Sequence, residues 1–518
     1  MNQSKSNASS KVKLIFNFIF NVFKPAFLLL SFTLIPFKCD VYADQLDISP
    51  KSSGVSSYLT DGSYSTGNNY HSGDTITISS DSPISSVYII WDSPVSEWTL
   101  DFNNTSMKCG TDGFLHELVK LTLPSTSITI NREADSRICG IYAFTEGELP
   151  DFVQDWNPSC READILVFST HADDEILFLG GVLATYGGEQ GLPVQVCYMT
   201  NYWNGLRIRE HEKLDGLLES GIRNYPVNGD FDDIYSETLK AAKSTYNYED
   251  VLEYVTEQIR TFKPNVVVTQ DLNGEYGHGG HMLLATAVTE AVCNSMDASF
   301  YPEQAATLGT WDVPKTYLHL YDESPIWLDL NTPLDKLGGR TAIETAKDAY
   351  LKHVSQQWCW FYVSDTYQYS CAKFGLYRTT VGPDTQTGYN PDGSISSSGG
   401  NMLENITTKA EAAALKAKEE AESRKALELQ SSKDAAQDAQ LSQSAQNAQA
   451  AQSSKSAQDA TDNAASDIQS KQNNKSSGIV SLSGHINNLP AFIILVAMIL
   501  LLILVLALIV MINKKKKR

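Results

Sequence analysis

The residues best suited to chemistry form two short clusters in the middle of the 518-residue chain. In the first cluster, residues 170–175 read THADDE, which places one histidine beside two adjacent aspartates. Like charges in a half-buried loop repel one another unless a cation lies between them, so this cluster favours a divalent metal. One aspartate can then bind the metal while the other faces water as a general base, which is the division that hydrolysis requires. The alternative is a helix N-cap whose acids are favoured by the helix dipole.

The second cluster, residues 273–281, reads NGEYGHGGH and places two histidines three positions apart. At the start of a helix, His278 and His281 can face one point, and imidazole is a preferred zinc donor beside carboxylate. The flanking glycines permit the tight turns that would present both rings. Two solvated loop histidines are the alternative.

Both clusters follow apolar segments that we expect to be strands, and both precede segments with helical spacing. The expected strands are 165–168, 194–198, 266–269 and 317–321, and the expected helices are 175–184, 207–220, 251–262, 283–292 and 342–353. Such alternation predicts a Rossmann-like α/β domain, a mostly parallel sheet with flanking helices, whose ligands bind at the carboxyl ends of the strands. We place this domain at residues 159–390.

Two segments of different composition flank the α/β domain. Residues 44–158 combine turn-forming residues with short alternating apolar runs, which predicts an antiparallel β-sandwich. This part is either a packing domain or a carbohydrate-binding module. Residues 391–488 are of low complexity, rich in Ala, Gln and Ser, and cannot form a core, so we expect a partly helical stalk.

The two ends of the chain predict export and membrane attachment. A basic start and an apolar run predict a cleaved signal peptide over residues 1–43, with an uncleaved signal anchor as the alternative. Residues 489–512 are long and apolar enough to cross a bilayer as a transmembrane helix, and the basic tail 513–518 would stay in the cytoplasm. We therefore expect a single-pass type I protein of the cell membrane with an extracellular catalytic head.

Charge and cysteine content narrow the range of partners. The chain has 61 acidic and 40 basic residues and a net charge of −21, which excludes a nucleic-acid binder and favours neutral or cationic partners and metal ions. One of its eight cysteines lies in the predicted signal, so the exported part keeps an odd number of thiols. Local spacing makes Cys109–Cys139 and Cys359–Cys371 plausible disulfides, although spacing does not fix connectivity.

Taken in order, the motifs between residues 163 and 384 resemble those of the PIG-L / LmbE-like de-N-acetylases. That family reads AHPDDE where this chain reads THADDE, and HPDH or HxxH where this chain reads HGGH. An RxxE helix at 209–212 and an HxSQ segment at 353–356 are further points of similarity. Residues 44–158 weakly resemble discoidin-type, galactose-binding domains.

The resemblance implies a zinc enzyme and a role for each matching residue. Zn²⁺ would be bound by His171, Asp174 and His281, with Asp173 as the general base. Tyr276 would help to polarise the substrate carbonyl, and His278 would stabilise charge or protonate the leaving amine. Arg209 would contact the sugar or the group that carries the acetyl.

We therefore expect a zinc-dependent hydrolase that removes N-acetyl groups from N-acetylglucosamine-type sugars of a surface or extracellular glycoconjugate. One alternative is a non-sugar amidase of the same mechanism, and another is a catalytically silent, glycan-binding surface adhesin. A nucleophilic role for Ser355 is disfavoured because no Gly-x-Ser-x-Gly sequence surrounds it.

Overall fold

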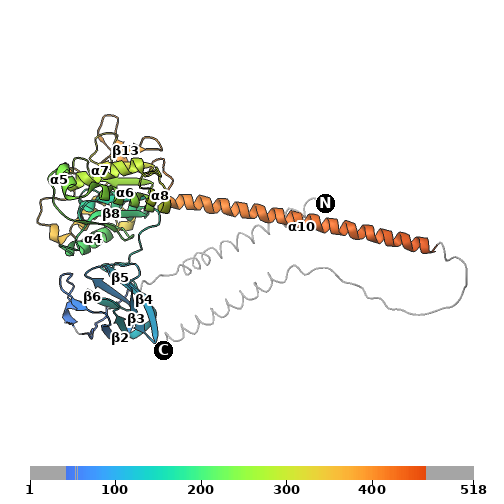
Figure 1. Ribbon diagram of the computed structural model, residues 1–518, viewed down its shortest axis with the longest axis horizontal. Coiled ribbons are helices and arrows are strands. Elements are labelled where there is room, and N and C mark those ends of the chain that lie inside the picture. The colour runs from blue at the N-terminus through green and yellow to red at the C-terminus, as the bar shows by residue number, and fades with distance from the viewer. Residues whose placement is uncertain (1–41, 53, 55, 462–518) are drawn as a thin grey trace, which may run out of the picture. The chain divides into compact units, whose positions relative to one another are not determined.

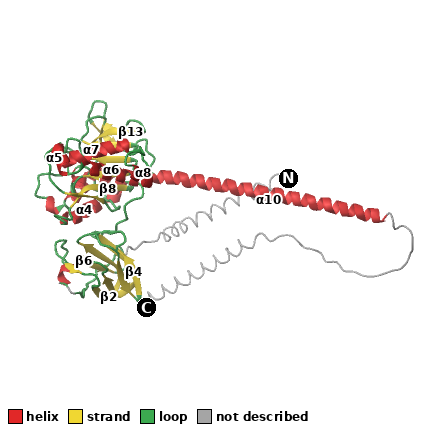
Figure 2. Ribbon diagram, viewed as in Figure 1, coloured by secondary structure: helices red, strands yellow, loops and turns green. Residues whose placement is uncertain are grey.

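The computed structural model describes residues 42–461 apart from 53 and 55. Two large sheets organise the part of the chain up to Ala421, which also includes the start of the helix α10 (Lys409–Thr461) (Figures 1 and 2). Among the described residues, no helix combines the length and the hydropathy needed to cross a membrane. The predicted transmembrane helix, and all but the last two residues of the predicted signal peptide, lie outside the described residues.

The first sheet is antiparallel throughout, with the strand order β1-β6-β2-β5-β3-β4. The 3₁₀ turn η1 (Ser56–Leu59) precedes its strands, which are β1 (Asn68–Tyr70), β2 (Thr75–Trp91), β3 (Trp98–Phe102), β4 (Thr105–Cys109), β5 (His116–Asn131) and β6 (Ser136–Phe144). The register of β2 against β5 shifts between Ser79 and Ile84, and such irregularities bend and twist long strands. One sheet can therefore enclose its own core around Trp91 and Trp98. The antiparallel pairing was expected, but the expected two-sheet sandwich is corrected to one continuous sheet.

The second sheet is mostly parallel, as the sequence predicts, with the order β12-β13-β11-β10-β7-β8-β9. Its parallel strands are β7 (Ile165–Ser169), β8 (Val194–Asn201), β9 (Val227–Asp232), β10 (Val266–Thr269) and β11 (Lys315–His319), and the antiparallel edge is β12 (Pro325–Trp327) and β13 (Lys373–Thr379). The helices that accompany it are α4 (Ile208–Glu219), α5 (Leu239–Thr245), α6 (Tyr248–Phe262), α7 (Gly279–Asn294), α8 (Pro302–Leu308) and α9 (Ala342–Tyr350), with the 3₁₀ turns η3 (Asp335–Leu337) and η4 (Val354–Gln356).

The chain reverses its direction across this sheet between β7 and β10. These strands are parallel neighbours, with Ile165 paired to Val266, but the chain continues from β7 to β8 on one side and from β10 to β11 on the other. Ligands of open α/β sheets bind in the crevice that such a reversal creates at the carboxyl ends of the strands. Both predicted clusters follow these two strands, so the topology brings them to one crevice.

The segment after the first cluster is not the single helix expected at 175–184. It comprises α2 (Asp174–Leu177), α3 (Gly180–Val182) and the π-helical turn η2 (Leu183–Glu189). A Cβ at Gly181 would lie only 2.7 Å from the Cys371 carbonyl oxygen. Glycine lets the backbones approach this closely, and it also weakens a regular helix.

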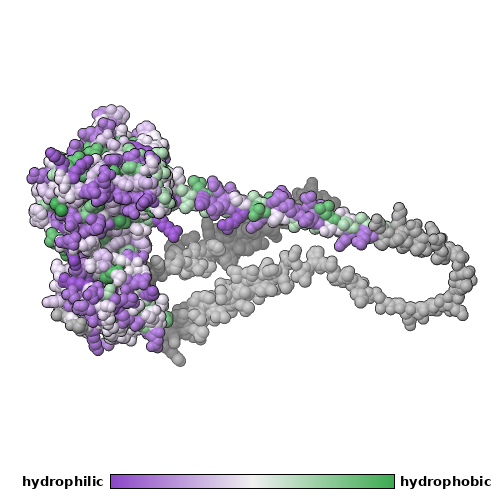
Figure 3. Space-filling view, in the orientation of Figure 1, coloured by the Kyte–Doolittle hydropathy of each residue, from purple (hydrophilic) through white to green (hydrophobic). Residues whose placement is uncertain are grey.

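The chain remains packed on the α/β part beyond the expected boundary at residue 390. A hairpin of β14 (Thr387–Tyr389) and β15 (Ile395–Gly400) follows, Met402 is fully buried, and the Lys409 amide donates to Asp164 Oδ1 at 2.8 Å. Along α10, Figure 3 shows mainly hydrophilic residues with scattered apolar ones, which agrees with the expected helical character of the stalk. All seven described cysteines are unpaired, so neither plausible disulfide is formed.

The first sheet contacts α4 through a buried polar cluster. His116 Nε2 lies 2.8 Å from His211 Nδ1 on α4. The ring of Tyr64 stacks on His211 with centroids 4.6 Å apart, and its hydroxyl donates to Asp215 at 3.1 Å. Because α4 also carries Arg209, the first sheet helps to hold the helix that enters the predicted site.

Both histidines of this contact are neutral in the folded protein. Burial lowers the pKa of His116 well below its ordinary value, and it lowers the pKa of His211 to about 4 despite the opposing charge of Asp92. Besides His211, the Tyr64 and Tyr88 rings face His116, and Lys213 lowers the pKa of His211 further.

Replacing His211 by asparagine should therefore destabilise the protein less at low pH than at neutral pH. An unfolded histidine titrates near pH 6.5, so below that value only the unfolded wild type gains a proton and its stability falls. The stability gap between wild type and variant should narrow by about 2 kcal/mol between about pH 7 and pH 5. Urea unfolding of both proteins measures this gap, in which contributions from Asp215 and other shared groups cancel. If the difference in stability between wild type and variant does not change with pH, His211 is not neutral in the folded protein.

Candidate active site

The first cluster forms the turn between β7 and α2. The Thr170 amide and hydroxyl both donate to Gln270 Oε1, at 2.8 and 2.5 Å, which ties this turn to the one after β10. Asp173 has a φ of 116°, a conformation that non-glycine residues rarely adopt. Its amide donates to Glu175 Oε2 at 2.8 Å, which holds the strained turn in place. Strain of this kind is concentrated at functional sites.

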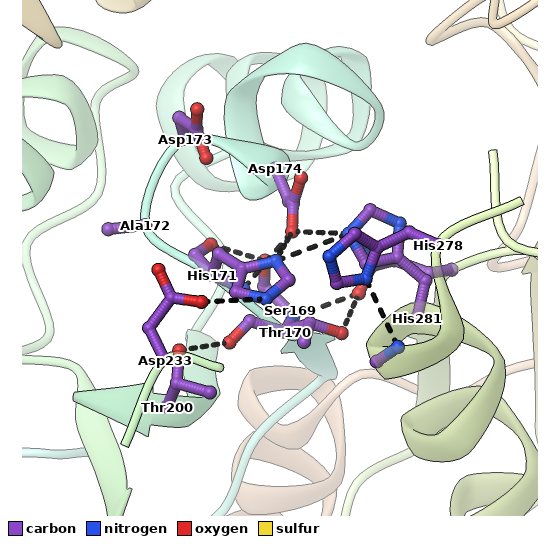
Figure 4. A network of polar contacts seen from close by, with 12 residues as sticks. Ser169, Thr170, His171, Ala172, Asp173, Asp174, Thr200, Asp233, His278 and His281 are labelled. Atoms are coloured by element: carbon purple, nitrogen blue, oxygen red, sulfur yellow. Dashed lines mark hydrogen bonds and ion pairs between the residues drawn. The ribbon is translucent and has the colours of Figure 1, made fainter. Parts of the chain in front are cut away.

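Three side-chain atoms converge at the crevice (Figure 4). Asp174 Oδ2 lies 2.8 Å from His171 Nδ1 and 3.0 Å from His281 Nε2, and the two nitrogens are 3.2 Å apart. All three residues are buried. Tetrahedral zinc holds its N and O ligands at about 2.0–2.2 Å, which separates neighbouring ligands by about 3.4 Å. The observed spacing is close to this value, and the structure brings together the three residues predicted as metal ligands.

The second nitrogen of each histidine faces a carboxylate. His281 Nδ1 lies 2.6 Å from Glu275 Oε2, and His171 Nε2 lies 3.4 Å from Asp233 Oδ1. When one ring nitrogen of a histidine donates its N–H to a carboxylate, the other ring nitrogen keeps a lone pair. That lone pair is what binds a metal ion. The sequence motifs by themselves indicate no role for Glu275 or Asp233. The position of Glu275 within the second cluster was the only local signal.

Negative charge dominates this cluster. Burial alone would lower the pKa of His281, but Asp174 and Glu275 raise it to about 10. Burial would raise the pKa of Asp174, but His281 and His171 hold it well below its ordinary value. Two imidazoles and a carboxylate in such a field are a donor set that fits a divalent metal such as zinc.

His278 lies beside the three converging atoms but makes a different hydrogen bond. Its Nδ1 accepts the Gly280 amide proton at 3.1 Å as the N-cap of α7. Burial and the neighbouring His171 and His281 lower its pKa to about 2, so the ring is neutral and its proton lies on Nε2. A ligand atom of His278 also lies within 4.8 Å of those of His171 and His281. The protonated Nε2 nevertheless suits a hydrogen-bond donor better than a metal ligand, which favours Asp174 as the third ligand.

Gly279 of the second cluster lets a neighbouring segment approach. The Gly279 amide donates to the Ser236 carbonyl at 2.7 Å, and a Cβ at Gly279 would lie 2.2 Å from the Thr238 carbonyl oxygen. Residues 236–238 therefore pack directly on the start of α7. This contact explains why glycine stands at position 279, where the family motif can carry a larger residue.

Asp173 is held by Arg209 from α4. The guanidinium donates to Asp173 Oδ1 at 3.1 Å, to the Ala172 carbonyl at 2.5 Å and to Asp233 Oδ2 at 3.1 Å. Burial raises the pKa of Asp173 to about 7, with Arg209 opposing the rise and Asp174 adding to it. Arg209 thus orients the predicted base, and its contact with substrate stays a prediction.

The HxSQ segment contacts α4 and Glu175, which in turn hold the residues of the site. The Ser355 amide and hydroxyl donate to Glu212 at 2.7 and 2.6 Å, which anchors the segment to α4. His353 Nε2 lies 3.3 Å from Glu175, whose other oxygen accepts the Asp173 amide. The Ser355 hydroxyl is committed to Glu212, which agrees with the expectation that Ser355 is no nucleophile.

A doubly wound sheet with two imidazoles and a carboxylate at its reversal point, and a further carboxylate beside them, has the parts of a metal-dependent hydrolase. Residues 166–292 match the family model described as PIG-L: GlcNAc-PI de-N-acetylase. The chain therefore carries a PIG-L family domain.

Several curated proteins are similar to this chain. A 1D-myo-inositol 2-acetamido-2-deoxy-alpha-D-glucopyranoside deacetylase of Catenulispora acidiphila is 25% identical over 31% of this chain and 56% of its own length. The deacetylase of the same name from Rhodococcus erythropolis is 27% identical over 31% of this chain and 62% of its own length. The chain thus spans less than two thirds of these relatives. Among solved structures, the N,N'-diacetylchitobiose deacetylase of Pyrococcus horikoshii matches with 18% identity and a TM-score of 0.30, over 38% of this chain and 71% of that one.

Proposed function

We propose that this protein is a zinc-dependent deacetylase that removes N-acetyl groups from N-acetylglucosamine-type sugars. The observation that carries the proposal is the convergence of His171 Nδ1, Asp174 Oδ2 and His281 Nε2 beside the strained residue Asp173. The relatives named as deacetylases of a 2-acetamido-2-deoxy-glucopyranoside support a sugar amide as the substrate.

The residues of the site divide the work of amide hydrolysis. A zinc ion held by His171, Asp174 and His281 would supply Lewis-acid activation of the carbonyl and of water. Asp173 would accept a proton from the attacking water, with its carboxylate oriented by Arg209. The Nε2 proton of His278 would stabilise developing charge or pass to the leaving nitrogen, and the Tyr276 hydroxyl would help to polarise the carbonyl. Water and the amide then yield acetate and a free amine.

We also propose that the catalytic head faces the outside of the cell and acts on a surface or extracellular glycoconjugate. The support for this context is the sequence of the two ends alone, namely the signal-like residues 1–43 and the apolar residues 489–512. The C-terminal helix would attach the protein to the membrane.

Chelation of the metal is expected to abolish acetate release, and stoichiometric zinc is expected to restore it. The reason is that loss of Lewis-acid activation removes several kcal/mol of transition-state stabilisation. Free acetate is measured with the full-length protein on N-acetylglucosamine glycosides, neutral chitin oligomers and cell-surface glycans. Release from non-sugar N-acetyl amides alone would favour the amidase. Glycan binding without zinc and without acetate release would favour the adhesin.

A further inference from the structure

Exposed aromatic rings are concentrated in one short segment near the candidate site. Trp358, Trp360 and Tyr362 are 81%, 62% and 53% exposed, and they fall within five consecutive residues. Isolated exposed apolar side chains are common, but a group of large ones marks a binding surface. We call residues 358–362 the aromatic segment.

A row of ring contacts connects this segment to the converging histidines. The ring centroid of Trp360 is 4.1 Å from that of Phe361, and Phe361 is 4.5 Å from Tyr276. Tyr276 in turn lies 5.5 Å from His278 and 5.3 Å from His281. Trp360 is therefore the exposed outer end of an aromatic row that begins at the site of chemistry.

The aromatic segment is anchored at both ends. Before it, Ser355 is bonded to Glu212, and after it the Cys371 amide donates to the Ser364 carbonyl at 3.0 Å. Within it, Tyr362 stacks on Tyr367 with centroids 4.5 Å apart. Rings that are already held against a neighbour, as Trp360 is by Phe361 and Tyr362 by Tyr367, lose little entropy when a ligand binds.

The chemistry of the aromatic segment suits a neutral glycan chain. Sugar rings have flat faces of C–H groups, and aromatic side chains offer large, rigid apolar surfaces against which such faces pack. Tyr235 is also 66% exposed, and its ring lies 4.9 Å from His278. The net charge of −21 disfavours an anionic polymer or an anionic lipid surface as the ligand.

We infer that the aromatic segment binds the sugar units next to the one that is deacetylated, so the substrate is an oligosaccharide or polysaccharide chain rather than a single sugar. The inference rests on the proposed function only for the deacetylation of the sugar at the histidines, and the binding of the neighbouring sugars does not depend on it. It names Trp360 and its exposed neighbour Trp358 as binding residues for the neighbouring sugars, with Phe361 and Tyr276 bridging Trp360 to the histidines.

Calorimetric binding to full-length zinc-loaded protein tests the inference separately from catalysis. The Asp173→Asn variant slows turnover during the titration, and neutral N-acetylglucosamine oligomers of increasing length serve as probes. Affinity should rise with oligomer length, and Trp358→Ala combined with Trp360→Ala should reduce the preference for long over short oligomers about tenfold, with Trp360→Phe retaining part of it. Tyr58→Ala, an exposed aromatic residue of η1, is the matched control and should leave the preference intact.

The outcomes separate the inference from the proposed function. Length-dependent binding that needs the tryptophans, without acetate release by the wild type, would support the glycan surface and refute the deacetylase. Affinity that is absent, independent of length or unaffected by the tryptophan changes would overturn the inference. Binding of neutral phospholipid vesicles that is lost in the same variants, with no oligomer binding, would also overturn it in favour of a membrane contact.

Discussion

Replacing Asp173 by asparagine lowers the rate of acetate release by about 10²- to 10⁴-fold, the usual contribution of a general base. Asparagine has nearly the same shape and can still accept the hydrogen bond from Arg209, but it cannot take a proton from water. Zinc content should stay at the wild-type level because the three converging ligand atoms belong to other residues. Initial rates and the metal content of the same preparation measure both effects.

Asp101→Asn is the control for this substitution, because Asp101 is an exposed carboxylate on β3 of the first sheet. It should leave the rate unchanged. A near-normal rate in Asp173→Asn would remove Asp173 as the base. Loss of zinc from that variant would instead show that Asp173 is itself a ligand.

Replacing Glu275 by glutamine weakens zinc binding by about 10- to 100-fold, as is typical when the partner of a ligating histidine is lost. Glu275 is buried, and its two oxygens face His281 Nδ1 at 2.6 Å and His319 Nδ1 at 3.0 Å. Glutamine has only one acceptor oxygen, so its NH₂ group must face one of the two imidazoles. The ring that loses its acceptor can no longer be held in its present tautomer and orientation.

Competition with a chromogenic chelator measures the zinc affinity of this variant. Activity should recover when zinc is raised, which distinguishes weaker binding from misfolding. Glu290→Gln is the matched control, since Glu290 lies exposed on the same helix α7 and accepts a hydrogen bond from Tyr248 at 2.7 Å. Equal zinc affinity in Glu275→Gln and wild type would show that Glu275 does not orient a metal ligand.

In the N-terminal part, the alternation of apolar residues predicts the strands but not how they join into a sheet. Alternating runs correctly predicted antiparallel strands, because period-2 alternation reflects one buried face. They did not reveal that β2 and β5 bend at a register shift into a single sheet, since a bulge depends on the partner strand. The sequence also did not predict the broken helix after Asp174, for a related reason. Gly181 packs against the backbone of Cys371, which is distant in sequence.

The sequence by itself determined the types of group available for chemistry and their order along the chain. A turn after an apolar strand presents its own residues, so THADDE and HGGH could be recognised from local spacing. Their meeting in one crevice was predictable because both follow strands of one alternating α/β pattern.

Only the tertiary structure decided which group each histidine nitrogen faces, and with it the choice between metal ligand and hydrogen-bond donor. That choice depends on Glu275, His319 and Asp233, and it separates His281 as a prospective ligand from His278 as a donor. The tertiary structure also brought Tyr276 into contact with Phe361 and so joined the aromatic segment to the site. Such contacts join residues far apart in sequence, and their formation depends on strand order and packing rather than on local spacing.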